Sequence, residues 1–107
     1  MMGLAREKCE PCQIGTPPLS KEEAKALATD TPQWTLAGDK IRREFEFADF
    51  RGSIDFINHV AEVAEEQGHH PDICVYYNKV TLELSTHTIG GLSKNDFILA
   101  SKIDRIA

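Results

Sequence analysis

Histidine is the side chain in this sequence best suited to moving protons at neutral pH. Imidazole titrates near pH ~6.5, so it can accept or donate a proton under physiological conditions. Two of the four histidines, His69 and His70, are adjacent and stand between Gly68 and Pro71. A short, constrained connection of this kind is where a rigid scaffold presents functional groups. Several imidazoles at one pocket would act in acid–base catalysis or bind a metal.

A third histidine, His87, follows a run in which apolar and polar residues alternate. Val80, Leu82 and Leu84 occupy one set of positions and His87 the other. On a strand these sets face opposite ways, which predicts that His87 points away from the core and is free to serve a site. The fourth, His59, lies within a predicted helix and is interpreted as structural or exposed.

Other kinds of site have weaker support in the sequence. Metal binding stays open, with Asp72, Cys74 or Asp96 as further ligands, although neighbouring side chains such as those of the histidine pair tend to diverge on an extended segment. The chain contains neither GxGxxG nor a P-loop, so a nucleotide has no visible cradle. Cys74 has apolar neighbours in a predicted strand, which favours a buried, inert thiol over a nucleophile.

A long helix must position the histidine pair. Asp49 can cap a helix over residues 50–67, Gly68 suits the left-handed conformation that ends it, and Pro71 disfavours its resumption. Its apolar residues recur at helical spacing and predict one buried stripe with a second contact surface beside it. The stripe comprises Phe50, Ile54, Ile57, Ala61 and Ala64, and the second surface Phe56, Val60 and Val63.

The remaining elements are two more helices and two hairpins. Capping boxes at residues 20–23 and 93–96 predict helices that end near Thr29 and Ile106. Period-two patterns predict strands at 34–37, 41–47, 73–77 and 80–87, with turns at 38–39 and 78–79. The order helix, two strands, helix, two strands, helix predicts an α+β fold, a four-stranded antiparallel sheet with helices packed on one face. The last helix is apolar on more than one side, which suggests packing against a second subunit.

Length and composition limit which functions and partners are expected. The 107 residues suggest a single domain over 19–107, preceded by an extended N-terminal arm over 1–18. Cys9 and Cys12 of the arm form a CxxC, interpreted as part of a plain tail, with metal or redox roles left open. The net charge of −5 disfavours nucleic acid and anionic membranes as partners. The sequence lacks the apolar run of a membrane span or signal peptide, so we expect a cytoplasmic protein.

The spacing of these residues resembles the signature of the pterin-4a-carbinolamine dehydratases. In that signature an acidic residue stands four positions before His-His-Pro, and an aromatic residue, a histidine and an aspartate follow in order. The matching residues are Glu65, His69, His70, Pro71, Tyr77, His87 and Asp96. The resemblance covers about residues 20–107. One departure is Ile73, where many relatives carry a tryptophan.

The resemblance implies the dehydration of a 4a-hydroxytetrahydropterin to quinonoid dihydropterin, without metal or cofactor. His69, His70 and His87 would be catalytic, with His69 and His87 exchanging protons and His70 positioning the substrate. The implied supporting or substrate-binding residues are Glu65, Pro71, Ser85, Thr86 and Asp96. We expect a pterin as the small-molecule partner and a homodimer or homotetramer. The alternative is a binding, assembly or coactivator-like protein on the same fold.

Overall fold

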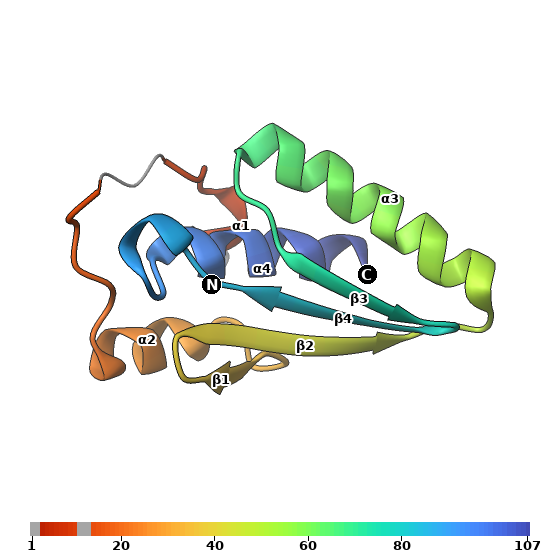
Figure 1. The fold of residues 1–107 in the computed structure, drawn as a ribbon, viewed down its shortest axis with the longest axis horizontal. Helices are drawn as coiled ribbons and strands as arrows, with labels where there is room; N and C mark the ends of the chain where they lie inside the picture. Colours follow the sequence, from red (N-terminus) through yellow and green to blue (C-terminus); the bar gives the residue numbers. More distant parts are fainter. Residues whose placement is uncertain (1–2, 11–13) are drawn as a thin grey trace.

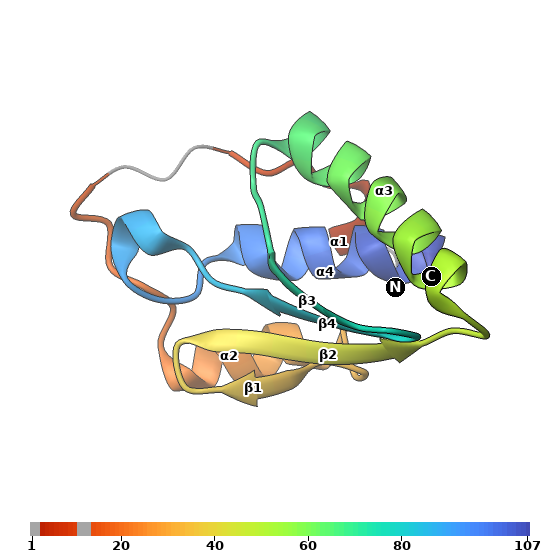
Figure 2. The same cartoon turned by 45° about the vertical axis from the view of Figure 1, so that its right-hand side comes forward.

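The computed structural model describes residues 3–10 and 14–107 and contains one antiparallel sheet of strand order β1-β2-β4-β3. The strands are β1 (Thr35–Ala37), β2 (Lys40–Glu46), β3 (Asp72–Tyr76) and β4 (Lys79–Leu84). The helices are α1 (Gly3–Arg6), α2 (Lys21–Ala28), α3 (Phe50–Gln67) and α4 (Lys94–Ile106), with a 3₁₀ turn η1 (His87–Ile89). Figures 1 and 2 show α3 and α4 on the same side of the sheet. The predicted α+β fold is confirmed.

The core lies between the central strands and α4. Val80, Leu82 and Leu84 of β4 are fully buried, as are Phe97 and Leu99 of α4. Burying each such side chain stabilises the fold by roughly 1.5–3 kcal/mol. Because β4 is covered on its helix side and flanked by β2 and β3, the segment that follows it starts from a fixed position.

Helix α3 begins and ends where its sequence predicts, but it buries a different face. Asp49 caps it by accepting a hydrogen bond from the Gly52 N–H at 2.8 Å, and Gly68 ends it with φ of +66°. The prediction that the stripe containing Phe50 forms the buried face is wrong, because Phe50 is 51% exposed and stacks on Tyr77. The buried residues of α3 are Ser53, Phe56, Val60 and Ala64. Helical spacing alone does not choose between two overlapping apolar stripes.

The chain's own N-terminus covers part of helix α4, which explains why α4 is apolar on more than one side. Leu4 of α1 is buried in the same core, and Lys102 Nζ donates to the Ala5 carbonyl at 2.9 Å. Lys94 forms an ion pair with Glu7 at 2.8 Å. The expectation that 1–18 is an extended arm therefore differs from the structure at α1, since an apolar residue there gains by docking. A second subunit is not needed to explain α4, and the oligomeric state stays a prediction.

The fourth strand ends earlier than predicted. It stops at Leu84, and a single bridge between Thr86 and Gly91 closes the loop that carries η1. His87 begins η1 and is exposed. The strand alternation invoked for His87 is therefore wrong, although the conclusion that His87 lies outside the core is confirmed.

Strand β3 is the exposed edge of the sheet. All five of its residues are exposed, including Ile73, Val75 and Cys74. The prediction of a buried Cys74 thiol is wrong, because β3 is an edge strand and its residues are left exposed. The following turn lies at residues 77–78 rather than 78–79, with Tyr77 in the left-handed region at φ of +55°. Among the described residues, no helix has the length and apolarity needed to cross a bilayer.

Docking of α1 on α4 can be tested with Leu4→Ala. Because Leu4 is only 6% exposed, we expect the free energy of unfolding to fall by about 2 kcal/mol or more. Urea unfolding followed by circular dichroism measures this. Ile14→Ala is the matched control, since Ile14 is 91% exposed and its loss should change stability by less than about 0.5 kcal/mol. Equal effects of the two substitutions would contradict docking of α1.

Candidate active site

His69 is held at the exit of α3 by backbone and side-chain contacts. Its N–H donates to the Ala64 carbonyl at 3.2 Å across the helix end, so the Gly68 turn fixes its position. Its ring Nε2 lies 2.6 Å from Asp96 Oδ1, and the side chain is 12% exposed. With Asp96 ionised, Nε2 carries the hydrogen that Asp96 accepts, and Nδ1 is the nitrogen left to exchange a proton.

Asp96 is the buried centre of this arrangement. Its side chain is fully buried at the start of α4. Besides His69, it accepts hydrogen bonds from the Thr86 hydroxyl at 2.9 Å and from the Ser93 N–H at 3.0 Å. The Thr86 and Ser93 hydroxyls also lie 2.7 Å apart. These partners compensate the cost of burying a carboxylate, so Asp96 both caps α4 and orients His69.

His70 takes part in a separate, exposed pair. Its Nε2 lies 2.6 Å from Glu65 Oε2, with the side chains 58% and 77% exposed. An ion pair in this setting contributes about 0–1 kcal/mol, because water screens it. Pro71 is half-buried and leads from His70 into β3. The pair can orient the His70 ring at the surface.

His69 and His87 lie in two cavities that share Thr86 as a lining residue. The cavity at His69 has a volume of about 280 Å³. The cavity at His87 has a volume of about 200 Å³ and also includes Ser85, Lys40 and Asp72. Thr86 lines both cavities, and its hydroxyl contacts Asp96. His70 lines neither.

The N-terminal arm forms part of the wall at His69. The Cys9 N–H donates to Gln67 Oε1 at 2.9 Å. The Asn95 side chain contacts both backbone groups of Glu10, accepting from its N–H at 3.0 Å and donating to its carbonyl at 2.6 Å. Cys9 is half-buried, so the interpretation of this segment as a plain tail is wrong for its described part.

Cys12, the second residue of the CxxC, lies outside the described residues. Sequence reasoning also missed Gln67 and Asn95 as part of the site. They line it because the arm docks on them, and no spacing in the sequence reports that docking.

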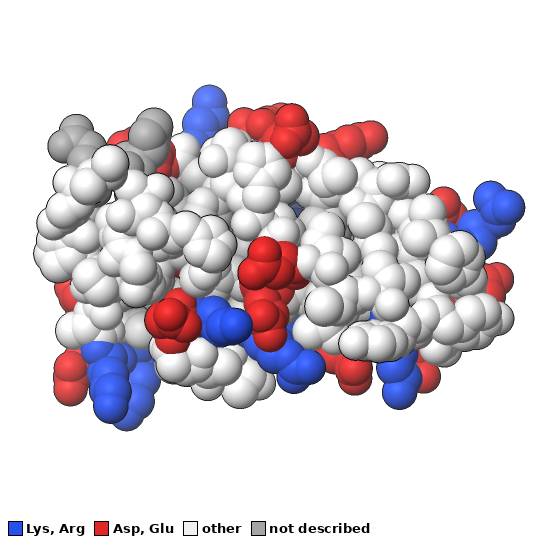
Figure 3. All heavy atoms as spheres, viewed as in Figure 1, with Lys and Arg blue, Asp and Glu red and all other residues white. Residues whose placement is uncertain are grey.

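The electrostatics around His87 are mixed. The hydrogen bond from Lys40 to Glu83, 3.1 Å long, raises the pKa of the Lys40 ammonium group, so Lys40 stays charged at neutral pH. Asp39 and Asp72 line the same cavity. Figure 3 shows basic and acidic side chains interspersed on the sheet face rather than separated. The cavity therefore offers both donors and acceptors.

Residues 3–10 and 14–107 contain no group of side chains placed to bind a metal ion. In this part of the chain, no three His, Cys, Asp or Glu side chains are placed to hold one ion. Asp96 is occupied by His69, and Cys74 lies exposed on β3.

The open four-stranded sheet backed by helices is the α+β architecture of a solved pterin dehydratase. A family model described as pterin 4 alpha carbinolamine dehydratase matches residues 17–106. The chain belongs to this family, which is named for a hydro-lyase reaction.

Curated bacterial relatives agree with this membership. A protein of Rubrobacter xylanophilus is 45% identical over 107 residues, covering 99% of this chain and 100% of its own. A protein of Nitrosomonas eutropha is 48% identical over 104 residues, covering 96% of this chain and 92% of its own. Both are provisionally named pterin-4-alpha-carbinolamine dehydratase.

Solved structures share the fold. A protein of Brucella melitensis, titled a transcriptional coactivator/pterin dehydratase, superposes with a TM-score of 0.80 at 30% identity, covering 84% of this chain and 98% of its own. A pterin dehydratase-like protein, titled a RuBisCO assembly factor of the alpha-carboxysome, gives a TM-score of 0.57 at 23% identity, covering 69% of this chain and 86% of its own. At that identity, similarity to the second structure supports a shared fold only.

The support that Thr86 gives to Asp96 can be tested with Thr86→Val. This change removes one hydrogen bond from a buried carboxylate, so we expect the free energy of unfolding to fall by about 1–3 kcal/mol. Thr88→Val is the control, because Thr88 is exposed and should change stability by less than about 0.5 kcal/mol. Chemical denaturation of both variants measures the difference, and an unchanged Thr86→Val protein would contradict the network.

Proposed function

We propose that this protein dehydrates a 4a-hydroxytetrahydropterin to quinonoid dihydropterin by histidine acid–base catalysis. The observation that carries the proposal is the contact of His69 with the fully buried Asp96, in a chain whose family is named for this reaction. A buried carboxylate that fixes one ring nitrogen is an arrangement suited to repeated proton transfer.

The reaction needs only proton movements. The carbon–oxygen bond at C4a breaks, and the hydroxyl leaves as water after it receives a proton. The neighbouring ring nitrogen loses its proton as the new carbon–nitrogen double bond forms. The electrons stay within the pterin, so acids and bases suffice. Positioned groups of this kind typically contribute ~10²–10⁴-fold to a rate.

His69 and His87 are proposed as the proton donor and acceptor. Asp96 holds Nε2 of His69, which directs the exchange to Nδ1, and its charge stabilises the imidazolium form. His87 lines the adjoining cavity with Ser85 and the shared Thr86, whose polar groups are proposed to meet the pterin's polar edge.

His70 is proposed to position the substrate rather than to transfer its proton. Its contact with Glu65 orients the ring, but both side chains are largely exposed. Because water surrounds this pair, it offers less control over a proton than the buried contact of His69. Pro71 fixes the direction of the chain as it leaves the pair.

A second candidate is a protein-binding or assembly role, alone or beside catalysis. Exposed apolar side chains on β3 and its turn favour it, with Tyr76 and Tyr77 exposed by 71% and 65%. Figure 3 shows that uncharged atoms dominate the surface on the right, where β3 ends and β4 begins. A binding role would not require His69 or His87, which separates it from the first proposal.

The catalytic proposal is tested by His69→Ala and His87→Ala. We expect each to lower the dehydration rate by an order of magnitude or more, because each removes a proton-transfer group. Stopped-flow absorbance on the 4a-carbinolamine, without added metal, measures the rate. His59→Ala is the matched control, since His59 is exposed on α3, and it should retain the wild-type rate. A wild-type rate no faster than buffer would refute the proposal.

A further inference from the structure

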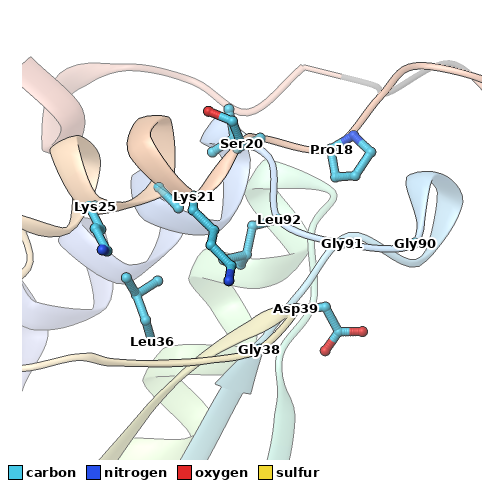
Figure 4. A pocket seen from close by; sticks show the side chains of 12 residues that line it. Pro18, Ser20, Lys21, Lys25, Leu36, Gly38, Asp39, Gly90, Gly91 and Leu92 are labelled. Carbon is cyan, nitrogen blue, oxygen red and sulfur yellow. The ribbon is translucent and has the colours of Figure 1, made fainter.

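A cavity of about 520 Å³ lies beside the proposed active site, and the reaction as described makes no use of it. It is open to solvent on one side and is bordered by α2, the turn between β1 and β2, and the loop at residues 90–92 (Figure 4). Small-molecule sites have volumes of about 300–1,000 Å³, so this cavity could hold a substantial part of a ligand.

The cavity adjoins that of His87. Both are lined by Asp39, Gly90 and Gly91, so one continuous surface runs from the imidazole into the larger space. Its remaining wall is well defined. The Leu19 N–H donates to the Leu92 carbonyl at 2.9 Å, which ties the segment before α2 to the loop.

Close packing completes this wall. Pro18 lies against Gly91, where an added Cβ would come within 2.8 Å of the proline ring. Only glycine permits this approach, so the loop backbone itself forms the boundary of the cavity.

The lining combines an apolar floor with positive charge. Ala24, Leu36 and Leu92 supply apolar surface, and Lys21 and Lys25 supply two ammonium groups on successive turns of α2. In Figure 4 the Lys21 side chain extends toward Leu92, whereas the carboxylate of Asp39 points away from it. No hydrogen bond or ion pair to another described residue is found for either lysine, so both can meet a ligand.

The covalent structure of a tetrahydropterin indicates which of its groups would enter the larger cavity. In a tetrahydropterin the C6 substituent is attached to the carbon next to N5, and N5 is bonded to the reacting C4a. A histidine acting at C4a or N5 therefore has the C6 side chain close beside it. From the cavity at His87, the adjoining space is where a long side chain could extend.

We propose that the cavity binds the C6 substituent of the substrate, and that this substituent is an extended tail ending in an anionic group, a carboxylate or a phosphate. The inference rests on the proposed function. A short neutral side chain would leave the cavity largely unfilled, whereas a partly apolar tail with a negative end matches the apolar floor and the two exposed ammonium groups.

Equilibrium binding of oxidised, unreactive pterins tests the proposal on the full chain. The probes are 6-methylpterin, a pterin carrying an aminobenzoyl-glutamate at C6, and a pterin carrying a phosphorylated polyol at C6. We expect wild-type protein to bind at least one anionic probe about tenfold or more tightly than 6-methylpterin, with the preference falling as salt rises. The two anionic probes distinguish a carboxylate tail from a phosphate tail.

The variants Lys21→Gln and Lys25→Gln test whether the two lysines cause the preference for an anionic probe. Each should weaken the preferred anionic probe by roughly fivefold, as expected for a partly exposed charge pair, and leave 6-methylpterin unchanged. Lys79→Gln, an exposed lysine on β4, is the control and should alter neither.

Equal affinity for all three probes, or equal weakening of all three by the lysine variants, would overturn the proposal. Because binding is measured without turnover, it separates the two claims. Retained preference for the anionic tail with no dehydration of any carbinolamine would refute the proposed function instead.

Discussion

The buried carboxylate of Asp96 is the interaction on which the rest of the site depends. It joins the start of α4 to the exit of α3 through His69, and to the segment after β4 through Thr86. An isolated buried carboxylate would cost several kcal/mol, and here three donors compensate that cost. Packing of α4 against the sheet and α3 places Asp96 where those donors converge. The same contacts that stabilise the fold therefore fix the tautomer of His69.

This dependence explains the division between rigid and exposed parts of the site. His69 is nearly enclosed, whereas His70 and His87 are exposed. A proton-transfer group benefits from a fixed geometry, and groups that meet a substrate benefit from access to the surface. Thr86 connects the two parts because it contacts Asp96 and lines both cavities. The larger cavity at α2 extends the same surface away from the chemistry.

The features that the sequence could predict are those governed by neighbours in the chain. The bounds of α3 follow from Asp49 and Gly68, since capping and the left-handed turn are local effects. The alternation in β2 and β4 predicted the sheet. Features that depend on distant packing were not predictable. Residues far away in the sequence decide whether α3 buries Phe50 or Phe56, whether Cys74 is covered, and whether α1 docks on α4. His87 was placed outside the core for a reason that fails, because β4 ends before it.

The most direct test of the account is the tautomer of His69, measured by ¹⁵N NMR of the imidazole rings at pH about 8.5, where free histidine is neutral. The account predicts a hydrogen on Nε2, held by Asp96, and an unprotonated Nδ1. A neutral ring with its hydrogen on Nδ1 would mean that Asp96 does not orient His69 as described, and it would contradict the proposed route of proton transfer.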